Sequence, residues 1–242
     1  MNWDNKINVL IAAAGKGSRA NLPYPKTLYK INGKEILARI LDNLEDIDKN
    51  PTIVVSPNGE KHIKDFLNRK SRKANIVIQK YPKGMGDAVL SFEKSSFSSS
   101  CKNILLIWGD IPFIRKATIQ TMIRNHFKNN NTFTFITSDT DKAYTRVLRN
   151  KRDDVIDILE TREENIPIKK GERDIGVFIF RKDQVFNLLK LELPKKYSLK
   201  SNEHGFLYVV NHLAKKGFKI EGIKIGKKEE LISLNKISDL NY

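Results

Sequence analysis

Apolar residues occur along this chain in two patterns, short continuous runs and stripes with helical spacing. Residues 7–14 (INVLIAAA) form an unbroken apolar run that ends at a glycine, which is typical of a strand buried on both faces of a sheet. Residues 34–45 repeat isoleucine and leucine at helical spacing, which predicts an amphipathic helix. The two patterns alternate as far as residue 138, and this predicts a mostly parallel sheet with helices on both faces.

The same reasoning assigns regular elements to the rest of the chain. We predict strands over residues 51–56, 75–79, 103–110, 132–138, 174–180 and 218–225, and helices over 34–45, 59–70, 86–96, 116–128, 182–190 and 203–216. After residue 144 the pattern changes, because residues 144–150 and 154–160 look like paired strands and residues 161–171 like a polar connecting loop. We therefore expect one α/β domain over residues 1–242, with a small C-terminal β/α sub-region folded against it.

Charge limits the class of partner. The chain has 44 Lys and Arg against 28 Asp and Glu, a formal net charge of +16, and the lysines are spread along its whole length. No block of like charge and no interleaved aromatic residues accompany this excess, so nucleic-acid binding is not the expected function. The charge favours phosphorylated small substrates instead.

Composition sets further limits on location and on metal sites. The single cysteine, Cys101, excludes an internal disulfide, and no apolar run reaches the roughly 20 residues of a membrane helix. We therefore expect a protein of the reducing cytoplasm with no membrane span. The four histidines show no metal-ligand spacing, and a solvated or capping role is expected for each of them (His62, His126, His204, His212). The sequence carries no signal of oligomeric state.

A glycine-rich turn after the first predicted strand is the strongest local signal of chemistry. The run AAGKGSR begins at Ala13 and ends at Arg19, and Pro25 and Lys26 follow it. A buried strand that opens into such a turn presents backbone N–H groups to phosphate oxygens, whose charge Arg19 and Lys26 can neutralise. The run matches neither the Walker P-loop nor the dinucleotide-binding fingerprint. The alternative is a plain glycine-rich turn with solvated cations.

A second signal is the sequence WGDIP at the end of the apolar strand predicted over residues 103–110. Ligands of open α/β sheets bind outside the carboxyl ends of the strands, so Asp110 should face a site. Mg²⁺ prefers hard oxygen ligands and is typically held by one or two carboxylates together with substrate phosphates. Asp110 is therefore a candidate Mg²⁺ ligand. The alternative is an aspartate that caps the turn before Pro112.

Several motifs, taken in order, resemble those of the sugar-1-phosphate nucleotidylyltransferases. They are AAGKGSR with Pro25 and Lys26, Gln79 followed by GMGDA (84–88), Gly109 and Asp110 with Pro112, YTRVLRN (144–150), ERDIG (172–176), and NEHG (202–205) with Tyr208. The likeness spans nearly the entire chain and looks closest to the pyrophosphorylase domain of bacterial N-acetylglucosamine-1-phosphate uridyltransferase. It implies a GT-A-like (Rossmann-like) fold and a Mg²⁺-dependent enzyme that joins a nucleoside triphosphate, with UTP favoured, to a sugar 1-phosphate.

The resemblance also implies a role for individual positions. Residues 1–140 would form the nucleotide-binding half and residues 141–242 the acceptor-binding half. The implied catalytic residues are Arg19 and Lys26, and the implied metal ligands are Asp110 and Asn235. The nucleotide would contact Ala13, Ala14, Gly15, Gly17, Ser18, Gln79, Gly84 and Met85, and the sugar would contact Arg146, Glu160, Asp174, Gly176 and Tyr208.

Departures from the family's pattern gather on the acceptor side. Thr145 replaces a glycine, Met85 a threonine, Asp174 with Ile175 an Asn-Thr pair, and Phe206 an acidic residue. GMGDA is also similar to a segment of the glucose-1-phosphate nucleotidyltransferases, so the sugar stays open. Two alternatives remain: a cytidylyltransferase acting on phosphocholine or another phosphorylated alcohol, and a catalytically inactive protein that binds nucleotides or polyanions.

Overall fold

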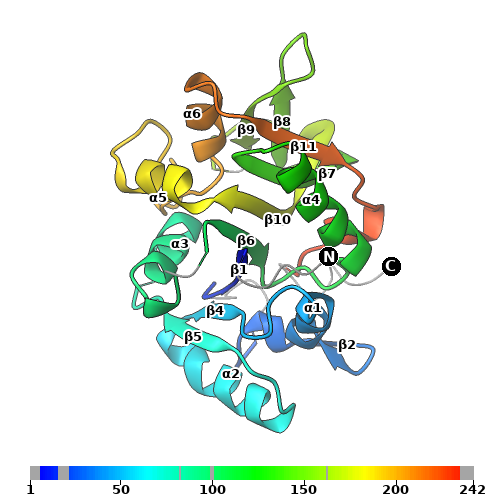
Figure 1. The fold of residues 1–242 in the computed structure, drawn as a ribbon, viewed down its shortest axis with the longest axis vertical. Coiled ribbons are helices and arrows are strands. Elements are labelled where there is room, and N and C mark those ends of the chain that lie inside the picture. Colours follow the sequence, from blue (N-terminus) through cyan, green and yellow to red (C-terminus); the bar gives the residue numbers. More distant parts are fainter. Residues whose placement is uncertain (1–5, 16–21, 82, 99–100, 162, 235–242) are drawn as a thin grey trace.

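Seven strands form one continuous sheet through the centre of the molecule (Figure 1). The computed structural model describes residues 6–15, 22–81, 83–98, 101–161 and 163–234. In spatial order the strands are β11 (Ile220–Lys224), β7 (Phe133–Ala143), β10 (Lys169–Arg181), β6 (Asn103–Trp108), β1 (Ile7–Ala13), β4 (Thr52–Val55) and β5 (Asn75–Ile78). The apolar run over residues 7–14 therefore forms the predicted strand inside the sheet, with a neighbouring strand on each side.

Most neighbouring strands run parallel, as the alternation of strands and helices predicts. β1 lies between β4 and β6, so that Leu10 is opposite Thr52 on one side and Leu106 on the other. The pairs β4–β5 and β11–β7 are also parallel. β10 is the exception, because it runs antiparallel between β6 and β7. The predicted α/β fold class with a mostly parallel sheet is therefore confirmed.

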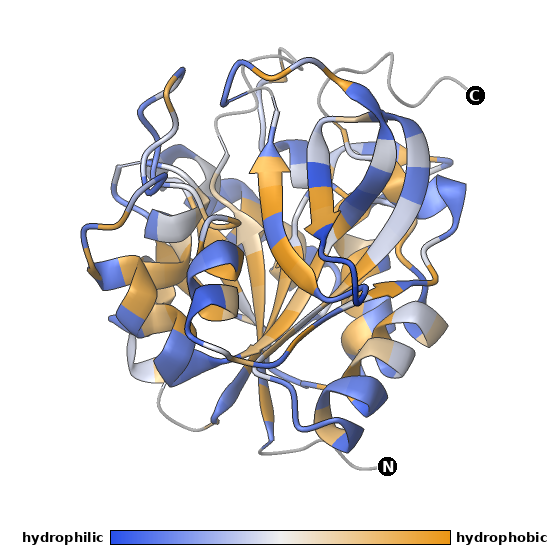
Figure 2. Cartoon of the chain, turned by 90° about the horizontal axis from the view of Figure 1, so that it is seen from above, coloured by the Kyte–Doolittle hydropathy of each residue, from blue (hydrophilic) through white to orange (hydrophobic). Residues whose placement is uncertain are grey.

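Helices cover both faces of the sheet. One face carries α1 (Ile36–Leu44), α2 (Pro57–Arg69) and α4 (Lys116–Lys128), and the other carries α3 (Met85–Glu93), α5 (Lys182–Lys190) and α6 (Val209–Lys215). Side chains alternate between the two cores along each strand, so Val9 and Ile11 of β1 pack on the first face and Leu10 on the second. Figure 2 shows the hydrophobic strands in the centre and hydrophilic segments on the outer sides of the helices.

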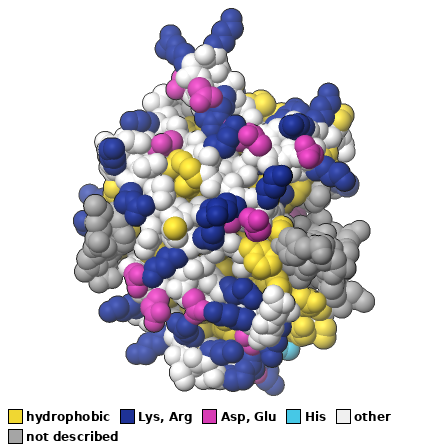
Figure 3. All heavy atoms as spheres, turned by 90° about the vertical axis from the view of Figure 1, so that its right-hand side faces the viewer, with side chains coloured by type: hydrophobic (Ala, Val, Ile, Leu, Met, Phe, Trp, Pro, Cys, Tyr) yellow, Lys and Arg dark blue, Asp and Glu magenta, His cyan; other side chains and the backbone are white. Residues whose placement is uncertain are grey.

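Charged side chains are dispersed over the surface seen in Figure 3. Lys and Arg lie there among acidic and hydrophobic residues and do not merge into one continuous basic patch. Nor is any helix in the described part of the chain long and apolar enough to cross a membrane.

A small hairpin stands outside the main sheet, in the predicted place. β8 (Thr145–Arg149) and β9 (Val155–Glu160) pair antiparallel as a separate two-stranded sheet, with α6 against β9. The remaining short elements of the described chain are η1 (Lys26–Leu28), β2 (Lys30–Ile31), β3 (Lys34–Glu35), η2 (Ser96–Ser98) and η3 (Lys228–Leu231).

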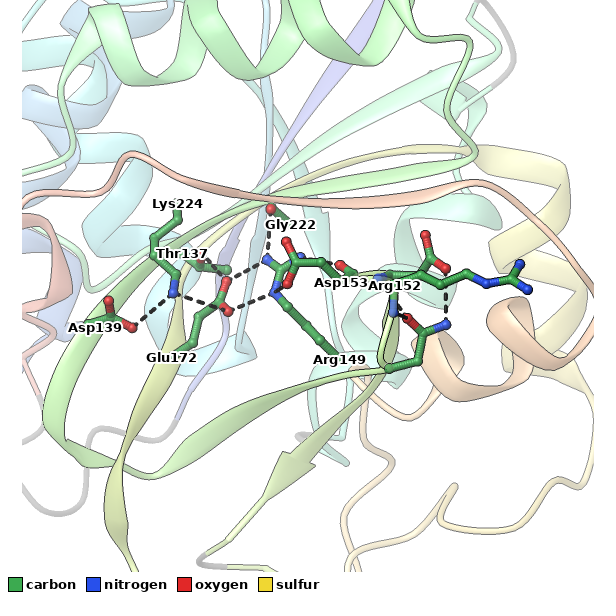
Figure 4. Close-up of polar contacts among 10 residues, drawn as sticks. Thr137, Asp139, Arg149, Arg152, Asp153, Glu172, Gly222 and Lys224 are labelled. Atoms are coloured by element: carbon green, nitrogen blue, oxygen red, sulfur yellow. Dashed lines mark hydrogen bonds and ion pairs between the residues drawn. The ribbon is translucent and has the colours of Figure 1, made fainter.

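A partly buried ion pair fastens this hairpin to the main sheet (Figure 4). Arg149 of β8 donates two hydrogen bonds to the Glu172 carboxylate of β10, at 2.8 and 2.6 Å, and a third to the Gly222 carbonyl of β11 at 2.9 Å. Thr137 of β7 donates to the same carboxylate, and Lys224 lies 3.7 Å from it. These bonds hold the pKa of Glu172 below its ordinary value, although burial alone would raise it.

Several predicted element boundaries differ from the observed ones, and three of the differences have a clear structural reason. β10 begins at Lys169, inside the predicted loop 161–171, because residues 169–174 pair with an extension of β7 that reaches Ala143. The helix predicted over 203–216 begins only at Val209. Residues 34 and 35 belong to β3, which pairs with β2, and not to the helix that follows. The division expected between residues 140 and 141, which separates two functional halves, stays a prediction; in the structure it lies within β7, and the main sheet draws strands from both sides of it.

The solvated or capping role expected of all four histidines was wrong for two of them, which are buried. His126 is buried in α4, where its ring nitrogens lie 3.0 Å from Thr134 Oγ1 and 3.2 Å from Asn103 Oδ1. His204 is buried beside Tyr208 and forms an isolated bridge with Tyr197. Burial lowers the pKa of both imidazoles to about 4, which keeps the rings uncharged.

Candidate active site

The two strongest sequence signals meet at the carboxyl ends of β1 and β6. The strand order reverses between these two strands, which is where open α/β sheets bind ligands. The Gly109 N–H donates to the Ala12 carbonyl at 2.9 Å, and a Cβ at Gly109 would lie only 2.8 Å from that carbonyl oxygen. A glycine at 109 therefore lets the WGD segment lie directly against Ala13 and the start of the glycine-rich turn.

Lys26 and Asp110 form an ion pair at this place. Lys26 Nζ donates to Asp110 Oδ2, although 84 positions separate the two residues in the sequence. The Lys26 side chain also passes Gly15, whose added Cβ would lie 3.9 Å from Lys26 Cε. Five predicted residues are thus brought to one edge of the sheet: the nucleotide-binding Ala13, Ala14 and Gly15, the catalytic Lys26 and the metal-binding Asp110.

Asp110 fits a divalent cation. Its second oxygen, Oδ1, is buried and has no hydrogen-bond partner among the described residues, a costly state unless a ligand satisfies it. Mg²⁺ sites of phosphoryl-transfer enzymes need only one or two carboxylates, with substrate phosphates supplying the other oxygens. Within the described ranges no group of three or more His, Cys, Asp or Glu offers a metal site formed by protein ligands alone.

The second predicted metal ligand, Asn235, lies outside the described residues, as do Gly17, Ser18 and Arg19. Leu234, which precedes Asn235 in the sequence, donates its N–H to the Asp110 carbonyl at 2.8 Å. The chain segment before Asn235 therefore lies beside Asp110.

Gln79 follows β5 and holds the loop that carries Gly84. Its side chain is 2% exposed, and its Nε2 donates to the Gly84 carbonyl at 3.0 Å and to Asp87 Oδ2 at 2.9 Å. Gly84 has φ +104°, which favours glycine, and Met85 begins α3 directly after it. In this structure Gln79 therefore shapes the loop predicted to contact the nucleotide.

On the acceptor side, Asp174 is fully engaged by the protein. Thr145 Oγ1 donates to Asp174 Oδ2, and the Gly176 N–H donates to Oδ1 at 2.9 Å. Burial raises the pKa of Asp174, and the Thr145 bond opposes that shift. Two departures from the family pattern, Thr145 and Asp174, are thus the two ends of one hydrogen bond.

Gly176 and Trp108 pack together next to this carboxylate. Gly176 has φ +81°, and a Cβ there would lie 2.8 Å from Trp108 Cε3. Trp108 also packs on Phe178, with ring centroids 5.7 Å apart. Its Nε1 is nevertheless buried without a hydrogen-bond partner among the described residues, so the indole offers a donor.

Glu160 ends β9 close to the same group. Burial, and then the charge of Asp174, raises the pKa of the Glu160 carboxyl to about 7. Its Oε2 would lie 3.3 Å from a Cβ at Gly205. Glu160, Asp174 and Gly176, three of the predicted acceptor residues, are therefore brought together.

Of the other two, Arg146 is not placed with them, whereas Tyr208 lies beside Glu160: its Cδ1 and Glu160 Oε2 would lie 3.7 and 3.3 Å from the same Cβ at Gly205. Arg146 lies on the opposite side of β8 from Thr145, and its Cγ and Cδ would be 3.4 Å from a Cβ at Gly171. Tyr208 is buried in the core with its hydroxyl 3.4 Å from the Leu188 carbonyl, and burial raises its pKa. Phe206 joins the aromatic core with Phe178, at a centroid distance of 5.5 Å.

The sequence reasoning did not predict that Arg173 and Tyr144 contact each other. The Arg173 guanidinium, in a residue only 7% exposed, lies 3.5 Å from the centroid of the Tyr144 ring and donates to its hydroxyl. Burial lowers the pKa of Arg173 to about 10, while the charges of Asp174 and Asp110 oppose this shift. The sequence signal was a charged residue, Arg173, just before the apolar run 175–180. The hydrophobic pattern alone does not show whether such a residue is buried or exposed.

Comparison with known proteins gives a consistent picture. A family model described as a MobA-like NTP transferase domain matches residues 9–176. The bifunctional protein GlmU of Buchnera aphidicola subsp. Schizaphis graminum is 35% identical over 175 residues, 72% of this chain and 37% of that protein. GlmU of Buchnera aphidicola subsp. Baizongia pistaciae is 26% identical over 98% of this chain and 51% of that protein. The chain thus spans half, or less than half, of the length of these relatives.

A solved structure supports the fold independently. The inositol-1-phosphate CTP transferase from T. maritima superposes with a TM-score of 0.73, covering 99% of this chain and 93% of that chain, at 18% identity. At this level of identity the likeness shows the fold alone. The Rossmann-like architecture expected from the sequence is confirmed by it.

Proposed function

The chain belongs to the family of MobA-like NTP transferase domains, and from this premise we propose that it is a Mg²⁺-dependent nucleotidylyltransferase of the cytoplasm. It would join UTP to N-acetylglucosamine 1-phosphate or a related hexose 1-phosphate and release pyrophosphate, giving an NDP-sugar. The observation that carries the proposal is the Lys26–Asp110 pair beside Gly15, with one buried Asp110 oxygen left without a partner. Similarity to the GlmU proteins supports uridylyl transfer.

The proposed reaction needs positioning and charge more than acid–base groups. An oxygen of the sugar phosphate attacks the α-phosphorus of the triphosphate in line, a new P–O bond forms, and the bond to the β-phosphate oxygen breaks. Lys26, with Arg19, would neutralise phosphate charge, and Glu160 with Gly176 would orient the acceptor. Bound Mg²⁺ would be held by Asp110 and Asn235 and would shield charge on the phosphates.

A cytidylyltransferase acting on phosphocholine or another phosphorylated alcohol is the second candidate. It is favoured by the acceptor side itself, where Glu160 and Asp174 lie close enough to interact and Trp108 packs beside Gly176. Carboxylates next to an indole suit an acceptor that carries a positive charge, because cations are attracted to both. A structural neighbour whose name includes CTP transferase supports CTP as the donor in this second candidate.

A pyrophosphate-release assay tests both candidates. UTP, CTP, dTTP, ATP and GTP are crossed with a panel of sugar 1-phosphates and phosphocholine, with and without Mg²⁺. We expect turnover with UTP and a hexose 1-phosphate, lost in Asp110→Asn and without the metal. Turnover only with CTP and phosphocholine would select the second candidate.

Silence with every pair would overturn both candidates. If triphosphates still bound in that case, and bound equally to Asp110→Asn, the chain would be the inactive nucleotide- or polyanion-binding protein considered from the sequence. Binding of that kind should weaken steeply with salt.

A further inference from the structure

The Gly84 loop is joined directly to the turn formed by residues 203–205. The Gly86 N–H donates to the His204 carbonyl at 3.0 Å, and the His204 N–H donates to the Lys83 carbonyl at 2.6 Å. We call this pair of hydrogen bonds, with the glycines around it, the 86–204 junction. It explains why the helix predicted to start at 203 starts later, since these backbone groups bond across to the loop and not along a helix.

The junction has no room for side chains on the loop. A Cβ at Gly84 would lie 2.4 Å from the His204 carbonyl oxygen, and a Cβ at Gly86 would lie 2.2 Å from the Gly205 carbonyl oxygen. Real Cβ atoms do not approach backbone oxygens this closely, so any substitution there pushes the two segments apart. The sequence GMGDA thus serves backbone packing as well as the loop conformation.

Each side of the junction leads to a different substrate region of the proposed enzyme. On the loop side, Gln79 holds Gly84 and Asp87 through its amide. On the turn side, Gly205 lies next to the Glu160 carboxylate and donates its N–H to the Lys196 carbonyl at 2.8 Å. The His204 side chain also contacts α6, because its Nε2 lies 3.3 Å from the hydroxyl of Tyr208, the N-cap residue of that helix.

We propose that the 86–204 junction couples the two substrate sites, and that Gly86 and His204 are positioning residues through which a bound triphosphate orders the acceptor pocket at Glu160. This inference rests on the proposed function. The physical reason is that the loop and the turn share their backbone hydrogen bonds, so ordering one restricts the other. By linkage, the acceptor must then strengthen triphosphate binding by the same factor.

The test uses the pair of substrates that turns over in the pyrophosphate assay. Calorimetry measures the Kd of the α,β-methylene analogue of that triphosphate, with Mg²⁺, in the absence and in the presence of saturating acceptor. In the unchanged protein we expect the acceptor to tighten analogue binding about tenfold. In Gly86→Ala we expect this ratio to fall to about one, while each separate Kd changes less than about threefold.

Gly86→Ala is a clean probe because Gly86 lies inside α3 and has an ordinary helical φ, so alanine adds bulk and no backbone strain. Gly217→Ala is the matched control, since Gly217 has φ +73° and open space around it. That variant should lose stability and keep the coupling.

Coupling that persists in Gly86→Ala would overturn the inference. So would independent binding of the two substrates in the unchanged protein, a result that needs no variant to fold and leaves the proposed function intact. Failure of the unchanged protein to bind any triphosphate would instead overturn the proposed function, and the inference with it.

Discussion

Lys26 is tied to Asp110 in the described structure, yet almost a quarter of its side chain is exposed. A lysine so placed can exchange its carboxylate partner for a phosphate oxygen when a triphosphate arrives. We expect Lys26→Ala to lower kcat/KM about 100-fold, because it removes a fixed cation from the transferring phosphates. Steady-state pyrophosphate release measures this.

Lys30→Ala is the matched control for Lys26, since Lys30 is more exposed and its ion pair with Glu35 spans 4.0 Å. It should leave kcat/KM unchanged. Near-normal turnover of Lys26→Ala with every triphosphate would show that the proposed phosphate site is wrong.

Glu160 makes the stability of the protein depend on pH. Its pKa is raised from 4.5 to about 7 by burial and by Asp174, so the folded protein binds this proton more tightly than the unfolded chain. This proton's contribution to the free energy of unfolding is fully present below about pH 4.5. It is lost as the pH rises through about 7, a loss of up to about 3 kcal/mol. We expect the Tm of the unchanged protein to fall relative to that of Glu160→Gln between pH 5 and pH 8. Parallel Tm curves would contradict this pKa.

For single residues, the sequence predicted which of them come together better than it predicted what each of them contacts. Ala13, Gly15 and Asp110 come together as expected, because they lie at or just after the ends of β1 and β6, which the hydrophobic pattern locates. Lys26, which begins η1, joins them from farther along the chain. Asp174 was expected to face sugar hydroxyls, but both of its oxygens accept hydrogen bonds from the protein. One partner, Gly176, is two residues away in the same strand, but the other, Thr145, comes from β8, and no local pattern predicts that contact.

At the scale of elements, the β8–β9 hairpin depends on the Arg149–Glu172 pair (Figure 4). Arg149→Met should lower the free energy of unfolding by about 3 kcal/mol, because it leaves the Glu172 carboxylate buried without its main partner. Urea denaturation measures this. Arg152→Met, on the exposed turn of the same hairpin, should have no effect.

Changing both members of the pair gives the sharper test of the Arg149 effect. Arg149→Met combined with Glu172→Leu should recover much of the lost stability, since no unpaired charge then stays buried. A double variant that is as unstable as the sum of the two single variants would show that packing, and not charge, fastens the hairpin.

Most element types were predictable from hydrophobic spacing, and the errors share one cause. α4 occupies the predicted range of 116–128 because its apolar stripe is continuous and sequence-local. The start of β10 and the late start of α6 depend on partners elsewhere, namely the extension of β7 and the Lys83 carbonyl. The antiparallel direction of β10 is a property of the topology, which spacing within one strand does not encode.

At the scale of the whole molecule, the charge of +16 should act on substrate capture. A positive field raises the local concentration of a polyanionic triphosphate, and added salt screens it. We therefore expect the KM of the triphosphate to rise about threefold or more between about 0.05 and 0.5 M NaCl, with kcat nearly constant. A kcat that falls while KM stays constant would instead place the effect of salt on the bound complex.

The place of β10 has a consequence for the synthesis of the protein. β10 lies between β6 and β7 although the ribosome makes it after both of them. Until residue 181 has emerged, the apolar strand β6 presents an edge that its final neighbour has not yet covered. Uncovered strand edges of this kind recruit other chains and start aggregation. A chain terminated before residue 169 would therefore form an incomplete sheet with an aggregation-prone edge at β6. Chaperones that bind nascent chains would have their largest effect while residues 109–181 are being translated.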